Sequence, residues 1–464
     1  MKFPQGVSES APTGFATIAG RLLHHAWPVL VAQLLSMSMM VADTVIAGRY
    51  GTADLAAVAI GSGLYISVVM LMAGLLQAVA PTVAHHVGAG RHDQLAPSLQ
   101  QGLWLATMLA VPGCLLLTHP GFLLELAGVP PELFERVEGY LAATAAGLPA
   151  VLLYRTFYAF NNAVGRPRAL MVISLIATST HVPLAWALVN GTLGLAPMGG
   201  MGCGVSTAVV SWLGLSCGLI YLLRNPAYQR YRLLSNWRRP DPKALAGLLR
   251  LGIPMGLSTF IEITSFTLIA LFIARLGAEA VAGHRVVANL AALIYMLPLA
   301  MSIACMVLVG QAAGARDWAR ARATVRVGML LTGGAASVIG LILWLLREPV
   351  IGLSTADAGV HTVALGLIIY ICLYQLFDSV QTVASHALRG YKVTLLPMLL
   401  HTLCFWGIGL GLGYWLSFHA PWRVASPTVA GFWEAGVLAT ILASVLFGML
   451  LRRVMRTQGD GFVR

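Results

Sequence analysis

The chain has 464 residues, of which 58% are hydrophobic and only 10% are charged. Ordinary soluble domains carry about 25% charged residues, so this composition excludes a soluble fold. The formal net charge of +12 would suit a nucleic-acid partner, but in a membrane protein the positions of the basic residues matter more than their sum.

Apolar stretches recur along nearly the whole chain, and each is long enough to cross about 30 Å of hydrocarbon. They predict an all-α integral membrane protein with twelve transmembrane helices. The predicted spans are residues 21–47, 55–83, 99–118, 136–159, 168–190, 200–223, 247–275, 281–312, 321–346, 360–388, 395–417 and 431–454.

Most of the 29 Lys and Arg residues fall between spans on one side, including Arg238, Arg239 and Lys243 in a central loop. The positive-inside rule then predicts a multi-pass protein with both termini in the cytoplasm. This asymmetry accounts for the basic charge, so we expect no nucleic-acid partner. Residues 1–20 contain no apolar segment of a cleavable signal peptide, and the first span is expected to direct insertion.

The chain contains an internal repeat. When Pro28 is aligned with Pro254, Arg49 falls on Arg275 and Gly51 on Gly277 without a gap. Two six-helix bundles related by a pseudo-twofold axis are implied, and transporters of this design bind their cargo where the repeats meet. The predicted domains are residues 1–223 and 247–464, joined by a cytoplasmic linker at 224–246, although that segment could equally be an ordinary basic loop.

Three acidic residues lie deep inside predicted spans: Asp43, Glu262 and Asp378. A charged acid at a helix centre costs about 2.5 to 3.5 kcal/mol on insertion scales, so each must be protonated, bind a cation or face water. No predicted span contains a basic residue at comparable depth, so structural ion pairs are not expected. The competing interpretation is protonated acids that form hydrogen bonds between helices.

Polar residues surround Asp378 at helical spacing, with Tyr374 one turn before it and Gln381, Thr382 and Ser385 after it. Such oxygen-rich surroundings suit a hard monovalent cation or a proton relay, whereas soft metals prefer His or Cys. We therefore expect no cofactor, and Na⁺ or H⁺ as a coupling ion.

The first span carries Met39 and Met40 within one helical turn of Asp43. Thioether side chains form an adaptable lining that suits a flat cationic aromatic compound, although a methionine stripe is more often plain packing. His181 is the histidine that lies inside a span away from the interfaces. It is either a core histidine whose ring nitrogens are hydrogen-bonded or a titrating group, since histidine changes charge near neutral pH.

The sequence contains none of the usual enzyme or nucleotide motifs, such as GxxxxGK[ST], HExxH or GxSxG. We therefore predict that the protein is not an enzyme, and that an ion gradient supplies its energy.

Several motifs resemble the multidrug and toxic compound extrusion (MATE) family, in its NorM-like bacterial branch, over nearly the whole chain. They are Met39-Met-Val-Ala-Asp-Thr-Val-Ile-Ala-Gly48, Asp54-Leu-Ala-Ala-Val-Ala-Ile60, Gly88-Ala-Gly-Arg91, Gly199-Gly-Met-Gly-Cys-Gly-Val205, Phe260-Ile-Glu-Ile263, Asp378-Ser-Val-Gln-Thr-Val383 and Leu388-Arg-Gly-Tyr-Lys392.

The resemblance implies a V-shaped pair of bundles around a central cavity, antibiotic resistance through multidrug efflux, and a bacterial inner membrane. It implies a cation site at Glu262 and Asp378, the candidate Na⁺ ligands, with contributions from Tyr374 and Asp43. Substrate contacts are predicted at Asp43, Asp357, Met40 and Gln381. The resemblance also implies that the first helix bends near Pro28.

One stretch departs from the family's pattern. NorM-like sequences tend to carry Asn-x-Pro-x-Asn on the fifth span, where this chain has His181-Val-Pro-Leu-Ala185. A sodium site built on those amides is therefore not expected in the N-terminal bundle.

These observations predict a monomeric antiporter that exports cationic lipophilic compounds against sodium or protons. The incoming cation and the outgoing drug would compete for the same carboxylates. The alternative is a lipid-linked oligosaccharide flippase of a related helical fold. Such a protein must bind anionic diphosphates, and basic residues would be expected in its cavity-facing spans.

Overall fold

The computed structural model describes residues 14–459, apart from 127, 193, 195, 230, 232, 234–236 and 421–427. Within the predicted linker, residues 230, 232 and 234–236 therefore lie outside the described residues. Twelve helices of the described chain are long and apolar enough to cross a membrane, by length and composition. The prediction of a twelve-helix, all-α membrane protein is thus confirmed.

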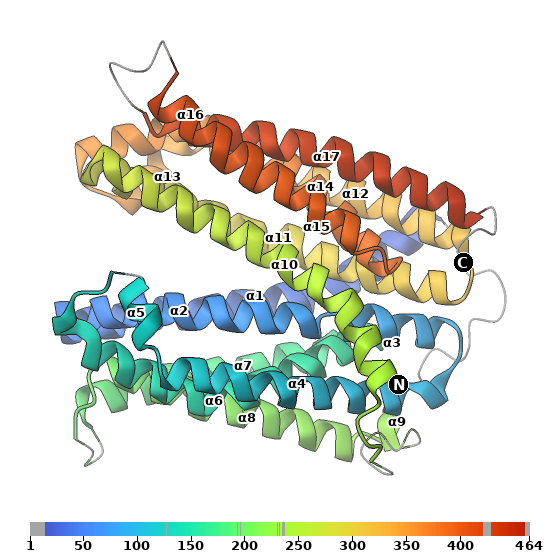
Figure 1. The fold of residues 1–464 in the computed structure, drawn as a ribbon. Coiled ribbons are helices and arrows are strands. Elements are labelled where there is room, and N and C mark those ends of the chain that lie inside the picture. The colour runs from blue at the N-terminus through green and yellow to red at the C-terminus, as the bar shows by residue number, and fades with distance from the viewer. Residues whose placement is uncertain are drawn as a thin grey trace. The chain divides into compact units, whose positions relative to one another are not determined.

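The described residues form two compact units, one of residues 27–256 and the other of residues 14–26 with 257–459. Most helices of the first unit run side by side (Figure 1). Its helices are α1 (Phe15–Tyr50) from residue 27 onward, α2 (Thr52–Leu76), α3 (Val79–Gly88), α4 (Leu95–Thr118), α5 (Gly121–Leu126), α6 (Phe134–Ala163), α7 (Pro167–Asn190), α8 (Gly200–Arg224) and α9 (Pro226–Gln229).

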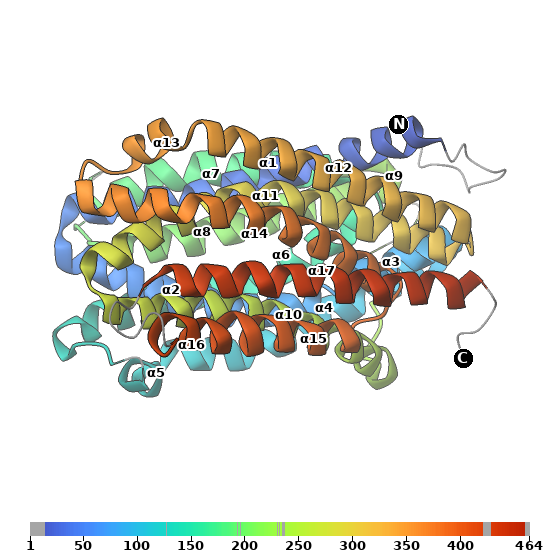
Figure 2. The same ribbon diagram turned by 90° about the horizontal axis from the view of Figure 1, so that it is seen from above.

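The second unit begins within α10, and its long helices also lie alongside one another, as Figure 2 shows from above. Its helices are α10 (Pro242–Ile273), α11 (Ala278–Gly314), α12 (Trp318–Leu345), α13 (Arg347–Ser354), α14 (Ala358–Gly390), α15 (Leu395–His401), the π-helical η4 (Thr402–Leu412), α16 (Gly413–Phe418) and α17 (Ala430–Gly459). Single 3₁₀ turns precede α4, α6 and α11, namely η1 (His92–Gln94), η2 (Pro131–Leu133) and η3 (Ala274–Leu276).

The internal repeat is visible in equivalent local structures. Pro28 lies inside α1 and Pro254 inside α10, so each half begins with a long proline-containing helix. Gly51 then precedes α2, and Gly277 precedes α11 with a φ of 103°, a conformation that favours glycine. The same order of helix, glycine turn and helix therefore occurs in both halves.

One helix is central to each unit. In the first unit α6 packs against α2, α4 and α8, and Gly147 on α6 lets the α8 backbone approach closely at Ala208. In the second unit α14 packs against α11, α12 and α17. Because α14 is enclosed by three helices, polar side chains in its second half are placed in the interior.

Candidate functional site

The polar stripe on α14 is buried along its length. Tyr374, Asp378, Gln381, Thr382 and Ser385 all face the interior of the second unit. The helix begins at Asp357, whose carboxylate caps it by accepting a hydrogen bond of 2.9 Å from the backbone N–H of Val360. The stripe starts nearly five turns later, so it lies well inside the helix rather than at its N-terminal end.

Gln381 connects Asp378 to a neighbouring helix. Its amide nitrogen donates to the Asp378 carboxylate at 3.0 Å and also lies 3.2 Å from the Thr382 hydroxyl. Its amide oxygen is 3.2 Å from Nε2 of His401, at the end of α15. The predicted substrate-binding role of Gln381 thus competes with a structural one, since both ends of its amide already have partners.

Glu262 on α10 lies close enough to Asp378 for the two carboxyl charges to interact. The Tyr295 side chain on α11 lies close enough to interact with both Glu262 and Thr382. Two further bonds hold α10 against η4 around Glu262, from Trp406 Nε1 to the Ile261 carbonyl and from Ser265 Oγ to the Phe405 carbonyl. Three helices therefore bring the predicted carboxylates together.

Arg389 is a buried basic residue on the same helix as Asp378, eleven residues further along the chain. It belongs to α14, only 4% of it is exposed, and its charge interacts with that of Glu262. The tenth predicted span, residues 360–388, ends one residue before it. In the structure the helix continues to Gly390, and the packing of α14 among its neighbours buries the guanidinium.

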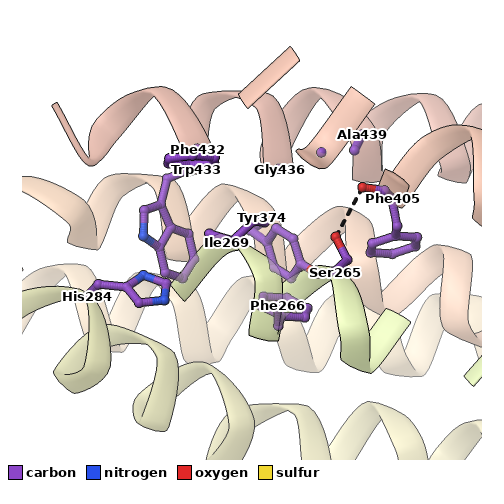
Figure 3. Close-up of a pocket in the computed structure, with 11 residues that line it drawn as sticks. Ser265, Phe266, Ile269, His284, Tyr374, Phe405, Phe432, Trp433, Gly436 and Ala439 are labelled. Atoms are coloured by element: carbon purple, nitrogen blue, oxygen red, sulfur yellow. Dashed lines mark hydrogen bonds between the residues drawn. The ribbon is translucent and has the colours of Figure 1, made fainter. Parts of the chain in front are cut away.

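An aromatic pocket of about 30 Å³ lies beside Tyr374 within the second unit. Tyr374 packs edge-on against Phe266 and Trp433, with ring centroids 5.9 and 6.2 Å away. Figure 3 shows His284 and Trp433 at one end of the pocket and Ser265 with Phe405 at the other. Nδ1 of His284 and Nε1 of Trp433 are buried without a hydrogen-bond partner among the described residues. The pocket is large enough for about one water molecule.

The first unit contains a separate polar chain. Nε2 of His181 on α7 lies 2.8 Å from Oδ1 of Asp43 on α1. On the other side of the ring, Nδ1 is 3.1 Å from the hydroxyl of Ser206 on α8. Local structure positions the histidine, because α7 begins with Pro167 and ends at Gly191, whose φ of 71° stops the helix.

The remaining predicted contacts lie elsewhere. Met40 is 54% exposed on α1, one turn before the buried Asp43. Asp357 is exposed and caps α14, as described above. Among the described residues no group of three or more His, Cys, Asp or Glu side chains could hold a metal ion.

Three of the interacting residues were not singled out from the sequence. Tyr295 lies in a continuous apolar run, where a tyrosine is normally read as packing. Asp54 lies just before the second predicted span, yet it is buried and bound by Arg136 at 2.6 Å and by the Gly200 N–H at 2.7 Å. Ser206 lies 25 residues from His181 in the sequence, and no sequence motif marks it as functional.

The match to a known protein family occurs twice, once in each half of the internal repeat. The MatE family model matches residues 28–187 and again residues 254–415, so the two matches begin at the positions that the repeat aligns. "Probable multidrug resistance protein NorM" of Aromatoleum aromaticum is 72% identical over 96% of both chains. "Multidrug resistance protein PmpM" of Pseudomonas aeruginosa is 35% identical over 94% of this chain and 91% of its own.

Solved structures share the fold. The MATE transporter VcmN of Vibrio cholerae, in its bent form, aligns with a TM-score of 0.86 over 97% of this chain and all of its own. Its sequence identity of 17% limits this likeness to the arrangement of helices.

Proposed function

The chain belongs to the MatE family of multidrug and toxic compound extrusion transporters, and from this premise we propose that it exports lipophilic organic cations in exchange for sodium ions or protons. The observation that carries the proposal is the proximity, in the second unit, of the partly buried Glu262 to the buried Asp378 and to the buried Arg389. The relatives named for multidrug resistance support export of several organic compounds.

The charges of the cluster suggest how exchange works. With all three groups ionised, the guanidinium compensates Glu262, and the negative charge of Asp378 remains uncompensated. Such a charge is unfavourable in a buried, membrane-embedded site. One monovalent cation cancels it, and so does one cationic drug molecule. The incoming ion and the outgoing drug therefore compete for the same excess charge, which is the basis of antiport.

The oxygen atoms around the carboxylates suit either coupling ion. Tyr295 contributes a hydroxyl group near Glu262, and Thr382 contributes one near Tyr295. The buried hydroxyl of Ser385, on the same stripe, has no hydrogen-bond partner among the described residues. Carboxylate and hydroxyl oxygens are ligands for a hard cation such as Na⁺, and the same carboxylates can instead take up a proton.

Ethidium accumulation in inside-out membrane vesicles tests the proposal, with the vesicle lumen either loaded with sodium or acidified. We expect one of these gradients to drive accumulation. Glu262→Gln and Asp378→Asn should each reduce the initial rate at least tenfold while the protein remains in the membrane. Glu348→Gln is the matched control, because Glu348 belongs to the same unit and its side chain is 63% exposed.

Wild-type rates in both Glu262→Gln and Asp378→Asn would refute the role of the carboxylates. If no gradient drives ethidium accumulation, the antiporter proposal fails. Binding of a diphosphate lipid to the purified chain would then favour the flippase.

A further inference from the structure

The predicted linker is fastened to α4 by side chains that bind its backbone. Gln100 is only 1% exposed, and both ends of its side-chain amide have partners in the linker. The amide oxygen accepts a hydrogen bond of 3.0 Å from the N–H of Arg238, and the amide nitrogen donates one of 2.9 Å to the carbonyl of Leu233. One buried glutamine therefore holds two separate points of the linker.

Gln101 repeats this pattern. Its amide oxygen accepts from the N–H of Asp241 at 2.9 Å, and its amide nitrogen donates to the carbonyl of Arg239 at 2.9 Å. Nε1 of Trp104, on the same face of α4, donates to the carbonyl of Arg238 at 3.0 Å. These three α4 side chains form a clamp on the linker: Gln100, Gln101 and Trp104. The clamp makes the backbone of residues 237–241 a fixed part of the first unit.

The clamp lies where the third predicted span meets the predicted cytoplasmic interface. That span begins at residue 99, directly before Gln100. The indole of Trp104 returns to the same level, because helical side chains tilt toward the N-terminus of their helix. Backbone groups at the edge of the hydrocarbon need partners within the protein, and the clamp supplies them. The clamped segment is thereby held at the depth of the lipid headgroups.

The side chains of the clamped segment face outward. Trp237 is 47% exposed, and its ring meets that of Trp104 edge-on, with the centroids 6.0 Å apart. Arg238 and Arg239 are exposed as well, and Lys243 follows at the start of α10. No described residue forms an ion pair with any of these three cations. Two tryptophan rings and three unpaired cations thus share one exposed surface.

The one acid in this segment has another role. Oδ1 of Asp241 accepts a hydrogen bond of 2.9 Å from the N–H of Lys243, and so caps the first turn of α10. Three basic residues against this one acid leave residues 237–243 with a net charge of +2. The surface therefore complements an anion.

We propose that the clamped segment binds an anionic phospholipid, with Arg238 and Arg239 on its phosphate and the rings of Trp104 and Trp237 against its glycerol and upper acyl chains. A guanidinium binds phosphate through paired N–H groups, and tryptophan is enriched at this depth because its ring is apolar and its N–H polar. Uncompensated cations at the interface attract anionic lipids. This inference goes beyond the proposed function and does not depend on it.

The clamp also explains why this segment is a better site than a loose basic loop. A flexible loop has to be ordered when its arginines engage a phosphate, and that ordering weakens binding. Here the hydrogen bonds to Gln100, Gln101 and Trp104 already fix the backbone of both arginines. The guanidinium groups are the parts that remain to be ordered by the lipid.

Lipid binding to the purified full-length chain tests the proposal without any transport measurement. Dioleoylphosphatidylglycerol and dioleoylphosphatidylcholine are titrated separately into delipidated protein in detergent, and bound lipids are counted by native mass spectrometry. We expect the phosphatidylglycerol to bind roughly tenfold more tightly. Equal affinities would overturn the proposal. Displacement of the phosphatidylglycerol by an equal concentration of inorganic phosphate would also overturn it, since the site would then take a free anion.

Charge variants locate the bound lipid. Arg238→Gln combined with Arg239→Gln should weaken phosphatidylglycerol binding roughly 20-fold, because each basic residue near an anionic headgroup contributes about fivefold. Arg224→Gln combined with Arg250→Gln is the matched control, since these arginines are exposed in the same unit and outside the clamped segment. The control should change the affinity by less than about twofold. Equal losses in the two pairs would show attraction to overall charge and overturn the site.

A variant without any change of charge tests the clamp itself. Gln100→Leu combined with Gln101→Leu removes four hydrogen bonds to the linker, and phosphatidylglycerol should then bind about three- to fivefold more weakly. Unchanged affinity would show that the clamp does not build the site.

Fluorescence places the lipid independently of these affinities. Dibrominated phosphatidylglycerol in phosphatidylcholine nanodiscs should quench Trp237, so Trp237→Phe should lose part of the quenching that the wild type shows. Equal absolute quenching in the wild type and Trp237→Phe would place the lipid elsewhere and overturn the proposal. None of these outcomes bears on whether the chain exports cations.

Discussion

The side-chain amide of Gln381 donates a hydrogen bond of 3.0 Å to the carboxylate of Asp378, one turn earlier on α14. This bond stabilises Asp378 when it is ionised and free of a cation. Gln381 itself is held by His401, which lies 3.2 Å from its amide oxygen.

Gln381→Met should therefore make Asp378 hold its coupling cation more tightly and release it more slowly. A hydrogen bond to a charged group contributes about 1.5 to 3 kcal/mol, so we expect roughly a tenfold lower half-saturating cation concentration together with a lower maximal rate. Vesicle uptake measured against sodium or proton concentration checks this. A higher half-saturating concentration with an unchanged maximal rate would contradict it.

Arg389→Gln should destabilise the protein and stop transport. Removing the buried guanidinium leaves the partly buried charge of Glu262 without compensation, which should cost on the order of 1 to 3 kcal/mol. The readouts are the thermal unfolding midpoint in detergent and ethidium uptake. Arg453→Gln is the control, because Arg453 is exposed at the end of α17. If Arg389→Gln unfolds at the wild-type temperature, the guanidinium does not compensate the carboxylates.

Asp54 stabilises one end of the first unit through two separate contacts. Asp54→Asn should lose only the ion pair with Arg136, about 1 kcal/mol for a partly exposed pair, since its amide oxygen can still accept from Gly200 N–H. Asp54→Ala loses both contacts and should cost about 2 to 3 kcal/mol. Unfolding measurements in detergent distinguish the two. Arg136→Gln should match Asp54→Asn, and a loss as large as that of Asp54→Ala would argue against two independent contacts.

Close packing of α6 and α8 depends on Gly147. An added Cβ would come within 2.6 Å of the Ala208 backbone, so Gly147→Ala should destabilise the first unit by about 1 to 3 kcal/mol. Gly63→Ala on α2 is the matched control, because nothing lies within 4 Å of its Cβ position. That control should be neutral or stabilising by up to about 1 kcal/mol. Equal unfolding midpoints for the two variants would disprove the close approach.

The amino-acid sequence alone determined how many helices cross the membrane, how the chain repeats and which family it resembles. The length of apolar stretches, glycine turns and short motifs are local features. Each can be recognised in the sequence without knowing which residues lie beside it in space. The acids at Glu262 and Asp378 could be selected for the same reason, since a carboxylate inside an apolar stretch is conspicuous on its own.

Only the tertiary structure decided which residues meet. A membrane helix is apolar nearly all round, so its hydropathy pattern does not reveal which face packs inward. Hydropathy therefore does not reveal that Arg389 is buried, that Tyr295 lies near Glu262 or that Asp54 pairs with Arg136. His181 and Asp43 are 138 positions apart, and the packing of α7 and α8 against α1 brings the imidazole and the carboxylate to 2.8 Å.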